Sequence, residues 1–270
     1  MRRSVLTAVL LALFVPPVVS PALAVEGMNL RWSGCAVSGG TSNRQFACDT
    51  NTGQELLYVS LVLDTPLASV QSIEASIDIN PAGGVMPGWW QLRSAGTCRQ
   101  NALGVALGQG AESPGCLNAM DWDHLASGGI AGYSSVIVAG SPAYRRLEFV
   151  VGVPDFDAPT LPAGQEIFVT RFSISHAKTV GTDACGGCDA PVCLGLHKIK
   201  LVPVNATGIR QLYTETFPGS STVSWQGASA GSVVDPELHG NDPGPDRMVT
   251  CAAAVPARNR TWGTLKSLYR

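Results

Sequence analysis

The chain has 270 residues, with 18 Lys and Arg against 20 Asp and Glu, so its formal net charge is −2. Charged residues make up 14% of the chain, compared with about 25% in ordinary soluble proteins. A charge this low and this evenly spread argues against nucleic acid or an anionic membrane surface as the main partner.

The first 24 residues have the pattern of a signal peptide. Arg2 and Arg3 begin it, an apolar run extends to Val15, and Ala22-Leu23-Ala24 supplies the small residues that signal peptidase recognises. The run is shorter than the about 20 residues that a transmembrane helix needs, and an N-terminal membrane anchor is the alternative. We therefore expect residues 1–24 to be cleaved. The rest of the chain should be secreted, extracellular or at the cell surface, with the periplasm as an alternative.

Strand patterns dominate the remaining sequence. Along Val70–Asn80 the apolar residues Ile73, Ala75, Ile77 and Ile79 alternate with polar ones, as in a strand with one buried face. The other clear candidates are Leu56–Asp64, Leu147–Val153, Phe168–Ile174, Leu196–Leu201 and Val223–Trp225. Weaker candidates are Met28–Trp32, Trp89–Leu92, Tyr133–Val138 and Gln211–Thr216.

Nine or ten strands without alternating helices predict an all-β protein. We expect an antiparallel β-sandwich of jelly-roll or cohesin-like type over residues 25–228. Short helical turns are expected at Cys98–Leu107 and Leu117–Leu125. Residues 229–260 are rich in Pro and Gly and predict an irregular linker.

The last ten residues, 261–270, predict a short amphipathic tail. Thr261 is a suitable N-cap, and Trp262, Leu265 and Tyr269 recur at helical spacing. So short a helix is marginal alone in water and needs a surface to dock on. We expect the three apolar side chains to be recognised by export or surface-attachment machinery. Docking on the chain's own sandwich is the alternative.

All eight cysteines follow the signal peptide, which in an exported chain predicts four disulfides. They are Cys35, Cys48, Cys98, Cys116, Cys185, Cys188, Cys193 and Cys251. Proximity in sequence favours Cys35–Cys48 and Cys98–Cys116. For the remaining four, Cys185–Cys193 with Cys188–Cys251 is one arrangement, and their pairing stays open.

A zinc site and a redox pair are alternative roles for some of these cysteines, and two acidic segments elsewhere are candidate calcium sites. Cys185, Cys188 and Cys193 could bind zinc with His197 or His176, and Cys185-Gly-Gly-Cys188 has the spacing of a redox pair. Calcium could bind the acidic groups of Asp155-Phe156-Asp157 or of Asp121-Trp122-Asp123-His124, neither of which has EF-hand spacing. We predict disulfides and no cofactor.

Two further patterns point to classes of function. Ser229 occupies the nucleophile position of a G-x-S-x-G motif, but no helix follows it and no βαβ unit surrounds it, so a linker is the preferred interpretation. Trp89 and Trp90 are neighbours in a predicted strand and should point to opposite faces. An exposed indole there, or at Trp122, could stack on a sugar, and ordinary core packing is the alternative.

Several segments resemble a group of uncharacterised secreted bacterial proteins. The shared features are Cys35 to Cys48, Trp89-Trp90, Cys98-Arg99, Ser173 to Gly181, Cys185 to Cys188, and a tail Thr261 to Arg270 of the form TWG-x-x-K-x-x-Y-R. The resemblance implies no known activity. At the level of fold, the strand pattern is similar to the cohesin-like and carbohydrate-binding sandwiches of secreted bacterial proteins.

We therefore expect a secreted or cell-surface structural or interaction protein without enzymatic activity, attached or sorted through its C-terminal tail. Its partners would be the attachment machinery and a polysaccharide or another surface protein. A glycan-binding module that uses exposed aromatic side chains is the first alternative, and an exported hydrolase is the second.

Overall fold

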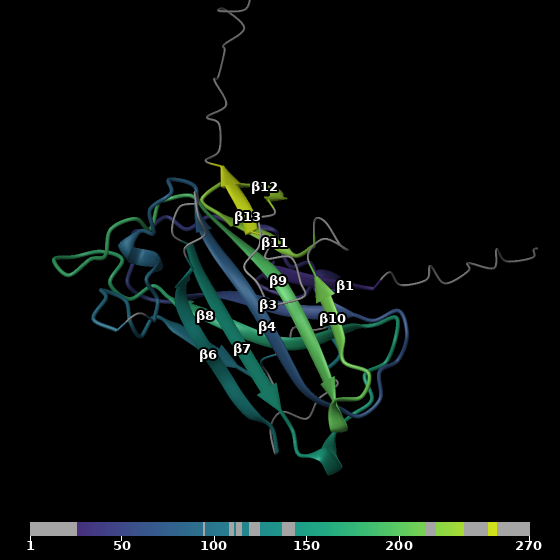
Figure 1. Cartoon of the computed structure of the whole chain (residues 1–270). Coiled ribbons are helices and arrows are strands. Elements are labelled where there is room, and N and C mark those ends of the chain that lie inside the picture. Colours follow the sequence, from purple (N-terminus) through teal and green to yellow (C-terminus); the bar gives the residue numbers. More distant parts are fainter. Residues whose placement is uncertain are drawn as a thin grey trace, which may run out of the picture.

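The computed structural model has the expected all-β antiparallel sandwich (Figure 1). It describes residues 26–93, 95–107, 111, 115–118, 125–136, 144–213, 220–234 and 248–252. The strands are β1 (Gly27–Trp32), β2 (Asn43–Arg44), β3 (Gln54–Val62), β4 (Val70–Pro81), β5 (Leu103–Ala106), β6 (Ser127–Val136), β7 (Tyr144–Gly152), β8 (Glu166–Ser175), β9 (Val192–Pro203), β10 (Arg210–Tyr213), β11 (Thr222–Trp225), β12 (Ser229–Val234) and β13 (Met248–Ala252). Short 3₁₀ turns join some of them: η1 (Ala36–Ser38), η2 (Gly88–Trp90), η3 (Asp155–Asp157) and η4 (Val204–Ala206).

Two sheets form the layers of the sandwich. The smaller sheet has the order β1-β3-β8-β5, and the larger has the order β2-β11-β9-β4-β7-β6 with β10 also paired to β9. Among the described strands, the short β2–β11 pair is parallel and the other pairs are antiparallel. In Figure 1, β9, β4, β7 and β6 lie side by side in front, and the strands of the smaller sheet cross behind them.

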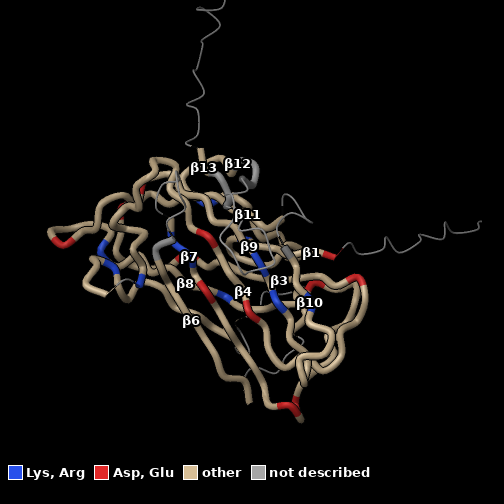
Figure 2. The backbone as a smooth tube through the Cα atoms, viewed as in Figure 1, with Lys and Arg blue, Asp and Glu red and all other residues tan. Residues whose placement is uncertain are grey.

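The outer face of the larger sheet carries paired charges. Lys200 on β9 lies opposite Glu74 on β4, with Nζ 3.1 Å from Oε1. Arg146 on β7 lies opposite Asp78 on β4, with Nε 2.8 Å from Oδ1. Figure 2 shows acidic and basic positions near one another along β9, β4 and β7. Opposite charges on neighbouring strands stabilise this register of the sheet.

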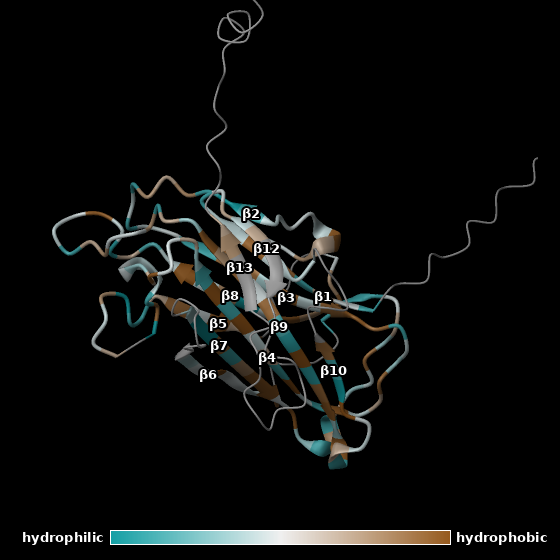
Figure 3. Ribbon diagram, turned by 45° about the horizontal axis from the view of Figure 1, so that its top comes forward, coloured by the Kyte–Doolittle hydropathy of each residue, from teal (hydrophilic) through white to brown (hydrophobic). Residues whose placement is uncertain are grey.

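The core lies between the inner faces of the two sheets. The alternation expected for β4 is confirmed, because Ile73, Ala75, Ile77 and Ile79 are all buried, and Figure 3 shows the resulting bands of apolar and polar residues along the strand. Phe149 of β7 meets Phe172 of β8 across the core, with ring centroids 5.9 Å apart. Burying each such side chain stabilises the fold by about 1.5–3 kcal/mol.

Two expectations about local structure were wrong, and a third falls mostly on residues outside the described part. Residues 98–107 form no helix, since Leu103–Ala106 is strand β5 at the edge of the smaller sheet, paired with β8. Trp89–Leu92 is no strand, because Pro87 starts the 3₁₀ turn η2 and its carbonyl accepts from Trp90 N at 3.0 Å. Near the second predicted helical turn, Leu117 instead forms a bridge to Ile167 on β8, and residues 119–124 lie outside the described part.

The stretch expected to be an irregular linker contains a pair of strands. Strands β12 and β13 pair with each other, with Ala230 opposite Cys251, and β13 contacts β9 and β4 of the larger sheet. The intervening residues 235–247, the tail with Trp262, Leu265 and Tyr269, the signal segment 1–24 and Trp122 lie outside the described residues. No helix among the described residues is long and apolar enough to cross a membrane.

The eight cysteines form four disulfides, as expected, but the predicted pairings were wrong. The bonds are Cys35–Cys116, Cys48–Cys188, Cys98–Cys185 and Cys193–Cys251. Proximity in sequence failed because the sandwich brings distant loops together: the bonded cysteines are 58 to 140 residues apart.

Candidate functional site

The candidate site lies at one end of the sandwich, where β8 ends and three loops meet. We call this region the cross-linked end and define it as residues 44–53, 87–102 and 175–191. Two of the disulfides, Cys48–Cys188 and Cys98–Cys185, join its loops to one another. Covalent links between loops reduce their freedom to move, so that side chains held between them keep a fixed arrangement.

Gly187 explains how two of these loops come so close. Its φ is +89°, in the left-handed region, and a Cβ placed on it would lie 2.4 Å from Pro87 Cβ. The neighbouring Gly186 accepts a backbone hydrogen bond from Trp89 N at 2.9 Å. Gly187 therefore permits close packing of its backbone against the ring of Pro87, whereas Gly186 contributes a backbone hydrogen-bond acceptor.

Arg99 is a buried cation at the centre of the cross-linked end. Its side chain is 2% exposed and its guanidinium carbon lies 3.7 Å from the ring centroid of Trp89. Nη2 donates to the carbonyl oxygen of Ser175, whereas Nε and Nη1 have no hydrogen-bond partner among the described residues. Burial lowers the pKa of Arg99 to about 10, so the group still carries its charge at neutral pH.

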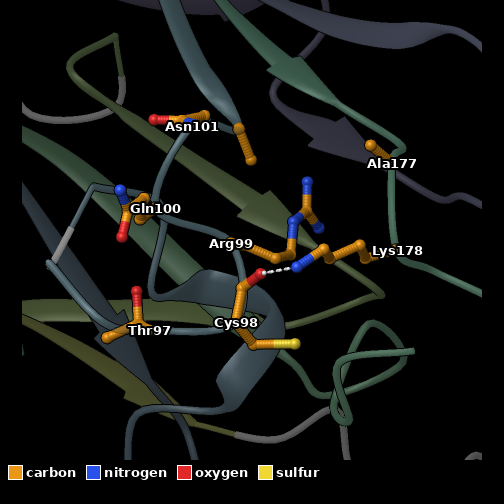
Figure 4. A pocket seen from close by; sticks show the side chains of 8 residues that line it. Thr97, Cys98, Arg99, Gln100, Asn101, Ala177 and Lys178 are labelled. Atoms are coloured by element: carbon orange, nitrogen blue, oxygen red, sulfur yellow. Dashed lines mark hydrogen bonds between the residues drawn. The ribbon is translucent and has the colours of Figure 1, made fainter. Parts of the chain in front are cut away.

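A pocket of about 260 Å³ opens beside Arg99. Its lining residues come from two loops: Thr97, Cys98, Arg99, Gln100, Asn101, Ala102, Ala177 and Lys178. The ammonium of Lys178 donates to the carbonyl oxygen of Cys98 at 2.9 Å, and Figure 4 shows the Arg99 side chain in the middle of the ring of lining residues. The pocket thus has two cationic side chains among its lining residues, the buried Arg99 and Lys178.

A row of aromatic rings links Arg99 to His176. The rings of Trp89 and Trp225 are stacked at 5.2 Å, Trp225 lies 6.0 Å from Phe46 in a tilted contact, and Phe46 stacks on His176 at 3.9 Å. Because the guanidinium of Arg99 lies over the ring of Trp89, the row has a cation at one end and an imidazole at the other. These ring contacts support both groups.

Trp89 and Trp90 do not have the arrangement predicted from the sequence. Both indoles are fully buried, and their ring centroids lie 5.3 Å apart within the core. The 3₁₀ turn replaces the alternation of a strand and directs both side chains inward. Neither can therefore stack on a sugar at the surface.

His176, at the other end of this row of rings, is buried and held in a cluster of polar groups. Its Nδ1 lies 2.8 Å from the carbonyl oxygen of Thr52, and its Nε2 lies 3.1 Å from Oε1 of Glu55. Glu55 also accepts from Arg44. Both ring nitrogens thus lie within hydrogen-bond distance of an oxygen atom, which fixes the orientation of the ring. The cluster fixes the loop that follows β8.

The predicted alternatives at the cysteine cluster were wrong. Cys185, Cys188 and Cys193 are bonded to three different distant cysteines, so the motif is no redox pair and offers no thiolates to zinc. A second grouping, Cys35, Cys116 and Glu166, has ligand atoms within 4.8 Å of one another. Its two sulfurs are likewise bonded to each other.

The remaining predicted positions do not join the site. Ser229 lies on β12 opposite Ala252, in a strand and not in a strand–turn–helix elbow. Asp155 begins η3 and accepts a hydrogen bond from Gln71.

Sequence reasoning did not assign a role to Arg99 or Lys178. The structure brings them to one pocket, because the loop that carries Cys98 and the loop that follows β8 meet at the cross-linked end. A scan against protein-family models and a search of curated proteins found no match for this chain.

Proposed function

We propose that the protein is an exported structural or interaction protein without enzymatic activity, in which the sandwich is the body and residues 261–270 are an attachment or sorting element. Four disulfides support an extracytoplasmic location, because such bonds persist in oxidising compartments. The observation that carries the proposal is where the last of these disulfides lies.

Cys193–Cys251 anchors the chain just before the tail segment. Cys251 is in β13, next to its last residue Ala252. Cys193 is in β9, between Ser224 of β11 and Asn80 of β4. A force on the chain beyond residue 252 would therefore pass through a covalent bond into an interior strand of the larger sheet. An attachment element requires this kind of coupling to the body.

The test is removal of everything after Pro256. We expect the truncated protein to keep its melting temperature within about 2 °C, a shift that corresponds to about 1 kcal/mol or less for a chain of this size. We also expect it to leave the envelope fraction and appear in the culture medium. Fractionation of cells that express each form, followed by immunoblotting, measures this.

Substitutions within the tail provide a matched comparison. Trp262→Ala, Leu265→Ala and Tyr269→Ala together should reproduce the truncation, whereas Thr264→Ala with Ser267→Ala should not. A truncation that lowers the melting temperature by many degrees and leaves the location unchanged would show that the tail is part of the fold.

A further inference from the structure

We infer that the pocket beside Arg99 and Lys178 binds an acidic monosaccharide unit of the uronic acid class, with the sugar carboxylate at Lys178. This inference is independent of the tail and concerns the sandwich alone.

The first argument is charge. The eight described residues that line the pocket include two cations and no acidic residue. Arg99 forms no ion pair with a carboxylate among the described residues, so its charge is not neutralised locally. A buried cation beside a pocket with low-dielectric walls gives the pocket a positive potential. An anion that enters would therefore be stabilised.

The second argument is the supply of hydrogen-bond donors. An ammonium has three N–H donors, and the Lys178 ammonium uses one of them on the carbonyl oxygen of Cys98. The others are free to bond a carboxylate. Arg99 Nε and Nη1 are buried, so Lys178 makes the direct contact and Arg99 contributes its charge.

The third argument concerns the neutral part of the ligand. Side-chain amides and hydroxyls both donate and accept, as sugar hydroxyls do. Gln100 and Asn101 supply such amide groups around the pocket, and Ala102 and Ala177 supply small apolar contacts. Gln100 is oriented by its own contact, since its Oε1 accepts from Gly96 N at 2.9 Å and its amide NH₂ remains for a ligand.

The fourth argument is size and rigidity. A volume of about 260 Å³ corresponds to about nine water molecules at ~30 Å³ each, which suits one sugar ring and not an oligomer. The Cys98–Cys185 bond fixes the loop that carries Arg99 to the loop that follows Lys178. A pocket fixed in this way loses little conformational entropy on binding.

The experiment is a titration of the full-length secreted protein with sodium D-glucuronate, followed by saturation-transfer NMR and calorimetry. We expect a dissociation constant on the order of 1 mM, typical for a ligand with about thirteen non-hydrogen atoms. D-glucose should bind at least about tenfold more weakly, because it has no carboxylate to meet Lys178. Raising the salt concentration should weaken the binding of glucuronate and leave the binding of glucose unchanged.

Variants tie the binding to the pocket. Lys178→Gln should weaken glucuronate about tenfold or more, and Lys178→Arg should retain most of the affinity. The matched control is Lys200→Gln, which removes a lysine from the outer face of the larger sheet and should change nothing. Melting temperatures confirm that each variant is folded.

Three results would overturn the inference: equal binding of glucose and glucuronate, tighter binding of inorganic phosphate than of glucuronate, or unchanged binding by Lys178→Gln. The protein truncated after Pro256 should bind glucuronate as the whole chain does. Failure of this inference therefore leaves the proposal about the tail untouched, and the reverse also holds.

Discussion

Glu166 shows how much a single buried side chain organises in this protein. Its carboxylate accepts from Ala36 N at 3.0 Å, Val37 N at 2.7 Å and Asn29 Nδ2 at 3.1 Å, and also from the hydroxyl of Ser60. The four donors come from β1, η1 and β3, and Glu166 itself begins β8. One carboxylate thus fixes the turn after β1 to the smaller sheet.

We expect Glu166→Gln to destabilise the fold by about 2–4 kcal/mol, because the amide NH₂ would face backbone N–H donors and leave buried groups unpaired. Urea unfolding with the disulfides intact measures this loss in the free energy of unfolding. Glu74→Gln is the control, since Glu74 is partly exposed and its ion pair should contribute less than about 1 kcal/mol. Equal losses in the two variants would contradict the role given to Glu166.

Tyr133 gives a prediction about alkaline pH. Its hydroxyl donates to the carbonyl oxygen of Trp90, and burial raises the pKa of Tyr133 to about 12. Because the ordinary value is near 10, the shift should contribute about 2–3 kcal/mol of stability below pH ~10, lost as the pH rises towards ~12. Ultraviolet titration of phenolate should show a late transition that disappears in Tyr133→Phe. A full set of tyrosines that titrate near the ordinary value would refute it.

At the scale of elements, the glycine pair between Cys185 and Cys188 offers an internal comparison. Gly187 has a positive φ and touches Pro87, whereas a Cβ on Gly186 would meet no atom within 4 Å. We expect Gly187→Ala to lower the free energy of unfolding by about 1–3 kcal/mol, and Gly186→Ala to change it by less than about 1 kcal/mol. Similar thermal unfolding of the two variants would show that the close approach is not required.

The strand pair β12–β13 depends on its covalent link. A two-stranded sheet alone is marginal in water, and the bond Cys193–Cys251 closes a loop of 58 residues. Replacing both cysteines by Ser should lower stability by up to about 4 kcal/mol by loss of loop-closure entropy. Hydrogen exchange should then show lost protection in β12 and β13 first, with β3 and β8 unchanged. Uniform loss across all strands would contradict this order.

How far the sequence predicts each element depends on where the element obtains its stability. Strands such as β4 and β7 were predicted because their burial alternates with each residue, which leaves a period of two in the sequence. Strand β5 and the turn η2 were not, because partners distant in the chain decide them. Leu103 pairs with Ile174, and Trp89 packs on Trp225. No local pattern carries that information.

At the scale of the molecule, the sequence predicted the sandwich and the four cross-links but not the pocket. An even number of cysteines in an exported chain implies bonds, whereas their pairing is set by which loops the sheets bring together. Likewise, Arg99 and Lys178 are 79 positions apart in the numbering, and the end of β8 brings them to one pocket. A lone arginine after a cysteine gives no sign that its charge will lack a counter-ion.

The connectivity of the disulfides also determines how the protein can mature. A chain that enters an oxidising compartment N-terminus first presents Cys48 to Cys35 long before Cys116 arrives, yet the native partners are Cys35–Cys116 and Cys48–Cys188. Early oxidation therefore gives a wrong bond that a thiol must later attack and exchange.

We expect unfolded, reduced protein to regain native bonds in a mixture of reduced and oxidised glutathione, and to be trapped in scrambled forms by oxidant alone. Peptide mapping distinguishes the two, and complete native recovery without a thiol would show that folding precedes oxidation. If native bonds return only when a thiol is present, cells that make this protein need a disulfide isomerase in the compartment where it folds.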